Sequence, residues 1–177
     1  MNDIVGGAKH NMSDTLIQRA KAGDKQAFAQ LYLQQKDRLF RYAYFKLGNT
    51  EDAQDAVSGC VTEAYAGITL LKTEKAFSSW LFRILYRECC RILRQNINRR
   101  VEESLEGVDY AVPETHHLAP ELEEALAILS PEEKDIVLLS VVSGYKTREI
   151  AETLDLNHAT VRSKLSRALA KMKNFLE

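Results

Sequence analysis

The end of the chain carries a basic stretch that could bind a polyanion. No Asp or Glu occurs between His158 and Leu176. With about 100° of rotation per helical residue, one face of this stretch is apolar. That face comprises Val161, Leu165, Ala168, Leu169 and Met172. The opposite side carries Thr160, Ser163, Lys164, Arg167 and Lys171. Such polar and basic side chains can reach bases and phosphates in a DNA major groove, although an ordinary solvated lysine-rich helix has the same composition.

The residues before this stretch favour DNA binding over a plain surface helix. Thr147–Leu154 predicts a short helix, and Asp155, Leu156 and Asn157 predict a three-residue turn, so the three segments have helix-turn-helix proportions. Apolar residues would pack the two helices together: Ile150, Ala151, Leu154, Leu156, Val161 and Leu165. A buried seam behind a basic outer face is what a recognition helix requires.

A second basic pattern occupies a helix that we expect from about Lys75 to Gln95. Its arginines share one side of the helix: Arg83, Arg87, Arg91 and Arg94. Trp80, Phe82 and Tyr86 are interleaved with them. Arginines that follow phosphates, beside aromatic rings that stack on bases, suit single-stranded or melting nucleic acid. Trp80 also falls on the apolar side of this helix, where core packing is the alternative role.

An acidic group opens another expected helix, which starts near Thr50. Glu51, Asp52 and Asp55 fall in or near its first turn. Complementarity to the helix dipole accounts for acids at this position without any binding role.

The chain shows no pattern typical of an enzyme or a metal site. It has no Gly-rich phosphate loop, zinc-protease motif or nucleophile elbow. Its four histidines have no metal-ligand spacing with the three cysteines. Cys89 and Cys90 lie beside arginines that could lower a thiol pKa, but Cys89 falls on an apolar helix face and is better explained as a core residue. We expect no enzymatic activity, no metal and no cofactor.

Composition narrows the remaining classes. Of the 177 residues, 45% are hydrophobic and 28% are charged, which is typical of a globular protein. No apolar run approaches the roughly 20 residues of a membrane-spanning helix, and the first residues lack the apolar core of a signal peptide. The three cysteines have no CxxC spacing. We therefore expect a protein of the reducing cytoplasm that does not insert into membranes.

The formal net charge of −1 conceals blocks of opposite sign. Residues 1–100 carry a net charge of +6, residues 101–135 carry −10, and residues 136–177 carry +3. Basic blocks on either side of an acidic one indicate polyanionic partners rather than a particular fold.

The periodicity predicts an all-α protein made of two small helical bundles. All prolines, Pro113, Pro120 and Pro131, lie close together, and residues 101–119 show no period, so these residues predict a flexible acidic linker. Expected helix boundaries include Ser13, Asp24 and Thr50 as starts and Gly23 and Gly48 as ends. A capping box, Ser130 to Glu133 with Pro131 at the first helical position, opens a buried helix that ends at Gly144. Residues 1–12 are expected to be disordered.

Taken together, these stretches resemble the extracytoplasmic-function group of bacterial sigma factors, the RNA polymerase subunits that recognise promoters. Phe77–Ile84 (FSSWLFRI) is similar to the start of the family's promoter-melting helix, and Glu51–Val57 (EDAQDAV) to its polymerase-binding helix. The family's C-terminal helix-turn-helix is matched by Leu129–Glu133, Glu149–Ala151 and Thr160–Ala168. The resemblance covers the chain from about Asp14 to Leu176.

The resemblance implies a role for each bundle. Residues 13–100 would bind core RNA polymerase through Asp52 and Asp55 and would recognise and open the −10 promoter element. The residues implied at the −10 element are Trp80, Arg83, Tyr86, Arg87, Arg91 and Arg94. Residues 120–177 would read the −35 element. The residues implied there are Thr160, Arg162, Ser163, Lys164, Arg167 and Lys171, with Arg162 and Lys146 as phosphate contacts.

The resemblance further implies a role for the linker and a second protein partner. The linker, with Glu102, Glu103, Glu106 and Asp109, would pass through a basic channel of the polymerase. A dedicated anti-sigma factor would be a second protein partner.

The chain departs from the family at several positions. Ser58 and Gly59 replace a usual Gln-Glu pair, Arg87 and Arg91 stand where Asn and Asp are common, and Ala159 replaces a frequent Gly. A glycine inside a helix costs about 1 kcal/mol of helix stability.

Two other functional classes stay open at this point. A stand-alone helix-turn-helix regulator would account for residues 121–177 but not for Trp80 and the arginines beside it. A degenerate sigma-like protein that only binds a regulator is supported by Ser58 and Gly59 alone. We favour the sigma factor.

Overall fold

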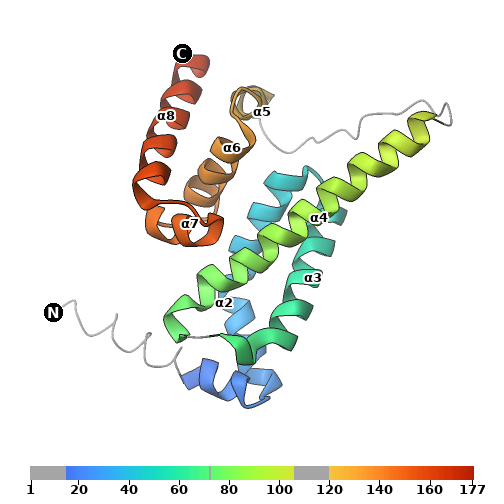
Figure 1. Ribbon diagram of the computed structural model, residues 1–177, viewed down its shortest axis with the longest axis vertical. Helices are drawn as coiled ribbons and strands as arrows, with labels where there is room; N and C mark the ends of the chain where they lie inside the picture. The colour runs from blue at the N-terminus through green and yellow to red at the C-terminus, as the bar shows by residue number, and fades with distance from the viewer. Residues whose placement is uncertain (1–14, 72, 106–119) are drawn as a thin grey trace.

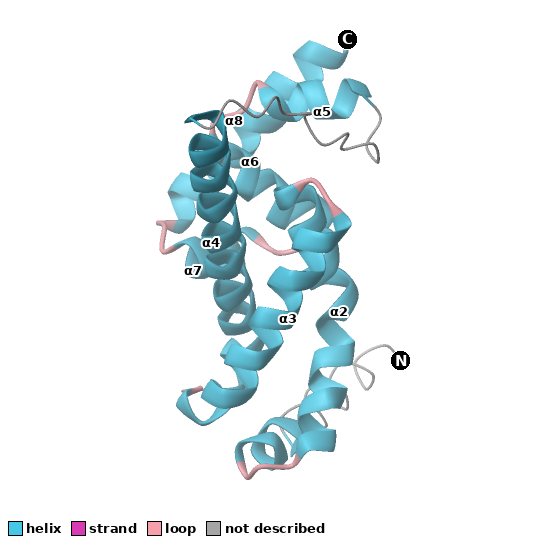
Figure 2. Ribbon diagram, turned by 90° about the vertical axis from the view of Figure 1, so that its right-hand side faces the viewer, coloured by secondary structure: helices cyan, strands magenta, loops and turns pink. Residues whose placement is uncertain are grey.

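The computed structural model describes residues 15–71, 73–105 and 120–177, and its regular structure over these ranges is entirely helical, as predicted. Figures 1 and 2 show two groups of helices that lie side by side. After a short helix at residues 15–21, the first group comprises α2 (Lys25–Leu47), α3 (Thr50–Gly67), the single 3₁₀ turns η1 (Ile68–Leu70) and η2 (Glu74–Ala76), and α4 (Phe77–Leu105). The second comprises α5 (Pro120–Ala127), α6 (Pro131–Val137), the π turn η3 (Leu138–Val142), α7 (Thr147–Leu154) and α8 (His158–Leu176). Residues 1–12, expected to be disordered, and residues 106–119 of the expected linker lie outside the described residues.

Local capping chemistry sets the boundaries of α2 and α3. The Asp24 side chain accepts hydrogen bonds from the backbone N–H groups of Gln26 and Ala27, as predicted for the start of α2. Gly48 ends α2 in the left-handed conformation, with φ 84°, which a residue without Cβ adopts at low cost. Asn49 then caps α3 by accepting from the N–H of Asp52. The chain therefore reverses direction between α2 and α3 at Gly48 and Asn49, two residue types that commonly end and begin helices.

The core of the first bundle lies along the apolar face of α4, which packs against α2 and α3. Its buried members include Leu81, Phe82, Leu85, Cys89 and Ile92. Fully burying one such large apolar side chain contributes roughly 1.5–3 kcal/mol. Trp80 is half-buried and packs against the Phe77 ring, with 6.2 Å between the ring centroids.

The cysteines of this core are poor nucleophiles. Burial raises the pKa of Cys60 to about 12 and raises the pKa of Cys89 further. Both thiols therefore stay protonated at neutral pH, and the prediction that Cys89 is a core residue is confirmed by its complete burial.

Helix α4 extends beyond the end that its periodicity predicts. It ends at Leu105 rather than near Gln95, so residues 101–105 of the expected linker are helical. The helix begins at Phe77, after η2, rather than at Lys75. Ile97 and Val101 are exposed, so this part of α4 buries no continuous apolar face from which the sequence could reveal a helix.

Acids at the start of α6 link this helix to α8 within the second bundle. The capping box is formed as predicted, with Ser130 N–H donating to Glu133 Oε2 at 3.0 Å and Glu133 N–H donating to Ser130 Oγ at 3.3 Å. Lys171 Nζ of α8 donates to the same Glu133 carboxylate at 2.8 and 3.0 Å, and Lys164 Nζ lies 2.8 Å from Glu132 Oε2. These contacts lower the pKa of Glu133 to about 2, with the Lys171 hydrogen bond as the largest cause and the Ser130 N–H next.

The two bundles also contact each other directly, which the sequence did not indicate. Helix α7 lies against α4, and η3 lies against α2. Lys46 of α2 forms an ion pair with Asp135 of α6, and both side chains are almost completely buried. Tyr42 donates a hydrogen bond to the same carboxylate at 3.4 Å. A buried ion pair whose members come from different bundles fixes how they dock.

Within the described residues, none of the helices combines the length and the apolar character needed to cross a bilayer.

The first prediction concerns Gly59, the glycine in the middle of α3. A Cβ built there would lie 2.5 Å from Glu88 Oε2, and Glu88 pairs with Arg91 at 2.7 Å. We expect Gly59→Ala to stabilise a Glu88→Ala chain by about 1 kcal/mol, because alanine has the higher helix propensity, and to stabilise the natural chain less. Urea unfolding measures both increments. Ser58→Ala, at the exposed neighbouring position, is the control and should act equally in both backgrounds. If Gly59→Ala changed the stability of both chains by the same amount, the contact between position 59 and the Glu88 carboxylate would be contradicted.

The second prediction concerns the pH dependence of the α6–α8 contact. Because folding lowers the Glu133 pKa from 4.5 to about 2, the ionised carboxylate stabilises the fold above pH 4.5, and this contribution is lost as the pH falls towards 2. Glu133→Gln should therefore lower the urea midpoint at pH 7, and its difference from the natural chain should shrink through this range. Glu124→Gln, on the exposed side of α5, is the control. A difference that persists unchanged at acidic pH would assign the effect to side-chain shape rather than to charge.

Candidate nucleic-acid interface

The helix-turn-helix is built by short contacts between α7 and α8. Asp155 takes the left-handed conformation, with φ 55°, and Leu156 N–H donates to the Ala151 carbonyl at 2.9 Å. Asn157 caps α8 by accepting from the Ala159 N–H at 2.8 Å. Thr147 Oγ1 lies 2.8 Å from His158 Nε2, which joins the first turns of the two helices. The angle between α7 and α8 is therefore fixed at their N-terminal ends, and the positive end of the α8 dipole is available to an anion.

The exposed edge of α8 is narrower than the sequence predicts. Arg162, Ser163 and Arg167 are exposed, and Thr160 is half-buried. Arg162 and Ser163 border a hollow of about 630 Å³ between α7 and α8. Its lining residues are Thr147, Ala159, Arg162, Ser163, Leu165, Ser166 and Leu169. A hollow flanked by arginine and serine suits a phosphate or a base edge.

The two lysines predicted on this edge have partners in α6, although the Lys171 side chain remains 50% exposed. Lys164 and Lys171 form ion pairs with Glu132 and Glu133 of α6. These acids are distant in sequence, so no pattern within α8 could indicate the pairing.

Leu169 belongs to the apolar face that the sequence predicts for α8, but its side chain is 41% exposed. The buried face of α8 is limited to Val161, Ala168 and Met172, and Leu169 lies about 100° away from Ala168. Sequence reasoning also missed Ser166, which the spacing from Arg162 and Ser163 could have placed on the same edge.

The predicted arginine side of α4 is exposed, but several of its members have intramolecular partners. Arg87 pairs with Glu63 of α3, and Arg91 pairs with Glu88. Arg83 donates to the backbone carbonyl of Glu152 in α7. Arg94 is exposed. Exposed ion pairs are worth about 0–1 kcal/mol, so a phosphate could replace Glu63 or Glu88 at little cost.

The aromatic members of this set are only partly accessible. Trp80 and Tyr86 are both half-buried. Burial, with Asp135 as the next cause, raises the pKa of Tyr86 well above its ordinary value, so its hydroxyl stays protonated.

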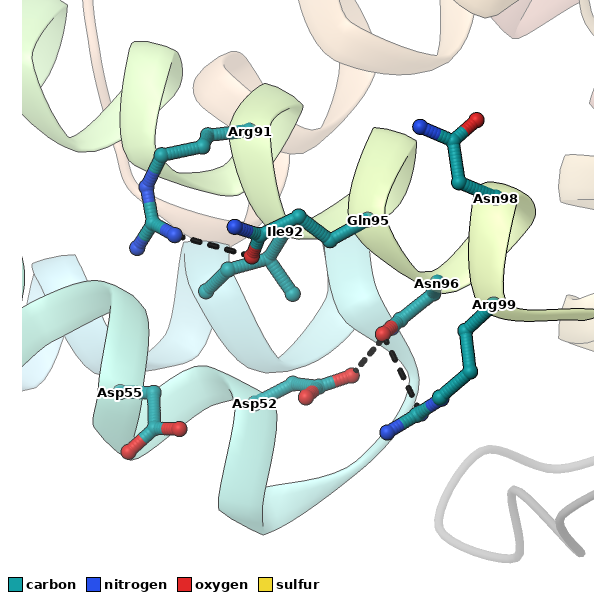
Figure 3. A pocket seen from close by; sticks show the side chains of 8 residues that line it. All are labelled: Asp52, Asp55, Arg91, Ile92, Gln95, Asn96, Asn98 and Arg99. Carbon is teal, nitrogen blue, oxygen red and sulfur yellow. Dashed lines mark hydrogen bonds between the residues drawn. The ribbon is translucent and has the colours of Figure 1, made fainter.

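The two aspartates predicted to bind a protein partner differ in their surroundings. Both line a cleft of about 500 Å³ between α3 and the C-terminal half of α4, shown in Figure 3. Asp52 Oδ2 accepts hydrogen bonds from Asn49 Nδ2 and Asn96 Nδ2, each at 2.8 Å. Asp55 is exposed and accepts no hydrogen bond from the part of the chain that the structure describes. Asp52 therefore joins α3 to α4, and Asp55 presents its carboxylate to solvent.

Across residues 15–71, 73–105 and 120–177, no cluster of three or more His, Cys, Asp or Glu side chains could hold a metal ion.

Comparison with known proteins identifies the family. The sigma-70 region 2 profile matches residues 31–99, and the sigma-70 region 4 profile matches residues 120–172. The ECF RNA polymerase sigma factor SigM of Mycobacterium tuberculosis is 31% identical over 173 residues, covering 96% of this chain and 88% of SigM. RNA polymerase sigma factor SigV of Bacillus subtilis is 31% identical over 140 residues, covering 78% of this chain and 84% of SigV.

Solved structures share the fold. CnrH, in complex with the cytosolic domain of CnrY, gives a TM-score of 0.74 at 22% identity over 93% of this chain and 97% of that chain. The sigma factor RpoE, in complex with the anti-sigma factor NepR from Bartonella quintana, gives 0.67 at 24% identity over 84% and 96%. With family profiles matched in both bundles and relatives matched over most of their length, the chain belongs to the extracytoplasmic-function group of the sigma-70 family of RNA polymerase sigma factors.

Proposed function

We propose that this alternative sigma factor binds core RNA polymerase through its first bundle, residues 13–100, and recognises promoter DNA with both bundles. One observation carries the proposal: a single chain presents two nucleic-acid surfaces of different kinds. Helix α4 combines exposed arginines with aromatic rings, which suits an unpaired strand, and α8 is a helix-turn-helix recognition helix, which suits duplex DNA.

At the −10 element, the first bundle would separate and hold the DNA strands. Arg87, Arg91 and Arg94 would contact phosphates once the weak pairs with Glu63 and Glu88 exchange for them. Trp80 and Tyr86 would offer ring edges to unstacked bases, and Arg83 would join them after it leaves the carbonyl of Glu152.

At the −35 element, the accessible edge of α8 would enter the major groove. Arg162, Ser163 and Arg167 would make the base or phosphate contacts, with Ser166 as an addition and with Thr160 and Lys146 near the backbone. The ion pairs of Lys164 and Lys171 with α6 favour a positioning role: these lysines hold α8 at the angle with which it meets the groove.

The proposed protein contacts of the chain are inferred from its acidic residues and from its family. Asp55 would contact a basic surface of the polymerase, while Asp52 keeps the N-terminus of α3 against α4. The acidic residues 106–119, which follow α4, would pass through a basic channel between the two DNA sites. An anti-sigma factor, the kind of partner bound to RpoE in the solved structure, would regulate this chain, and the chain would act in the cytoplasm, where the polymerase works.

The two rival classes have less support. A stand-alone regulator would leave the arginines and aromatics of α4 without a role. The interaction-only protein relied on Ser58 and Gly59, and the contact of Glu88 with Gly59 gives that glycine a packing reason.

The third prediction tests polymerase binding. The purified chain should co-migrate with core RNA polymerase on gel filtration at moderate salt. Asp55→Ala should weaken this complex with its urea midpoint unchanged, because the Asp55 carboxylate is exposed. Asp52→Ala should instead lower the urea midpoint, because Asn49 and Asn96 lose their acceptor. A chain that binds duplex DNA but never co-migrates with the polymerase would favour the stand-alone regulator.

The fourth prediction tests the −35 surface. With a promoter fragment selected by the holoenzyme, Arg162→Ala or Arg167→Ala should cost about 1–3 kcal/mol in promoter binding and leave co-migration with core polymerase intact. Lys173→Ala is the matched control, since it removes a cation from the exposed far end of α8. Equal loss of promoter and polymerase binding would mean that the arginine supports the fold rather than the DNA contact.

A further inference from the structure

The loop between η3 and α7 inserts an aromatic side chain into the first bundle. Tyr145 is buried, although its neighbours Gly144 and Lys146 are exposed. Its ring contacts Arg38 of α2, whose guanidinium carbon is 4.0 Å from the ring centroid, and Phe82 of α4, whose ring centroid is 4.3 Å away. The Tyr145 hydroxyl lies 2.8 Å from Ser78 Oγ. The second bundle thus fills a specific site on the first.

This site has the chemistry that proteins use for an unpaired base. The site is lined by a guanidinium and by an aromatic ring that is tilted 54° to the Tyr145 ring, and groups of these two kinds hold unpaired bases in proteins. Polar groups stand at its edge: Ser78 Oγ donates to Gln35 Oε1 at 3.4 Å, and Arg38 Nη1 donates to the same oxygen at 3.5 Å. A tyrosine ring with its hydroxyl resembles a pyrimidine, which is a six-membered ring with polar groups on its edge. Ser78 and Phe82 lie one turn apart on the same side of α4, and Trp80 of the proposed −10 surface lies on a different side of the same helix.

Other contacts hold the loop in this site. Arg38 Nε donates to the carbonyl of Ser143 at 2.6 Å, directly before the Gly144 turn. The buried ion pair of Lys46 with Asp135 also joins α2 to α6 across the interface. Arg83 donates to the carbonyl of Glu152, so α7 covers part of the α4 surface as well. The bundles cannot separate without releasing the ring, the ion pair and these carbonyl contacts.

We propose that the Tyr145 loop is an internal competitor for single-stranded DNA: a base of the unpaired promoter strand takes the place of Tyr145 on Arg38, Ser78 and Phe82 when the two bundles separate. The proposal rests on the proposed function. It adds a binding site for one unpaired base and a loop that blocks this site while the bundles are docked. The closed chain binds an unpaired strand weakly, since its apparent affinity is reduced by the fraction of open molecules. Any event that separates the bundles therefore allows the −10 surface to bind an unpaired strand.

The test uses the full chain and its Tyr145→Ala variant. Small-angle X-ray scattering reports whether the bundles separate, and fluorescence anisotropy with labelled single-stranded 12-mers of dT, dC, dA or mixed sequence reports strand affinity. We expect Tyr145→Ala to have a larger radius of gyration and to bind at least one 12-mer about tenfold more tightly. Phe175→Ala is the control, because it removes an exposed aromatic ring of α8 outside the interface. It should change neither measurement.

A second pair of variants identifies the site itself. In the Tyr145→Ala background, Arg38→Ala should abolish the gain in strand affinity, whereas Arg41→Ala, at an exposed cation one turn further along α2, should keep most of it. Asp135→Ala opens the interface from a different contact and should reproduce the gain if Tyr145→Ala folds poorly. Far-ultraviolet circular dichroism checks that each variant remains helical.

Three results would overturn the proposal. The first would be a natural chain with the same radius of gyration as the open variants. The second would be open variants that bind the single strands no more tightly than the natural chain. The third would be a gain in strand affinity that persists when Arg38 is replaced by alanine. Co-migration with core polymerase is measured on the same variants. If co-migration persists while the gain is missing, the competitor is wrong and the proposed function stands; if co-migration fails in the natural chain, the proposed function fails first.

Discussion

The arrangement of the molecule depends on a buried charge pair, Lys46 with Asp135. Taking two charges out of water costs several kcal/mol for each ion, and their attraction offsets this only while both stay paired. Since the lysine belongs to α2 and the aspartate to α6, the pair is satisfied only when the bundles dock in one orientation. The hydrogen bond from Tyr42 narrows that orientation further. Burial and the nearby Lys46 lower the pKa of Lys134, so this part of the interface disfavours additional positive charge. The docked position of α7 on α4, and with it the burial of Tyr145, follows from this constraint.

The two nucleic-acid surfaces differ in how tightly they are held. The recognition helix α8 is fixed by its apolar seam, by the caps at its N-terminus and by the acids of α6, so its exposed edge is a rigid unit suited to a regular duplex groove. The arginines of α4 are held by exposed ion pairs, which phosphates can replace with little loss. A surface that exchanges its partners suits a strand whose shape changes as DNA opens. The difference in rigidity between the bundles therefore matches the difference between duplex reading and strand capture.

The polar contacts of α3 explain the glycine in the middle of this helix and the acidic residues at its start. Gly59 leaves room for the Glu88 carboxylate, which in turn holds Arg91 on the outer side of α4. Asp52 is satisfied by Asn49 and Asn96 and keeps the start of α3 against the long helix. Of the acids at this helix start, Asp55 alone lines the cleft without a hydrogen-bonding partner among the described residues. The division into one positioning acid and one exposed acid narrows where a protein partner can dock.

Features that arise between residues close together along the chain could be predicted from the sequence. The caps at Asp24 and Ser130, the reversal at Gly48 and the short turn at Asp155 all formed as predicted, because each depends on one side chain and a backbone group a few residues away. The all-α class and most of the buried face of α4 could be predicted because helical periodicity records burial directly. Which basic residues are free to contact DNA depends on how the helices pack together. Lys164, Lys171, Arg83 and Arg87 are engaged by groups from other helices, and Tyr145 is buried by a different bundle, because partners far apart along the chain leave no pattern within any one helix.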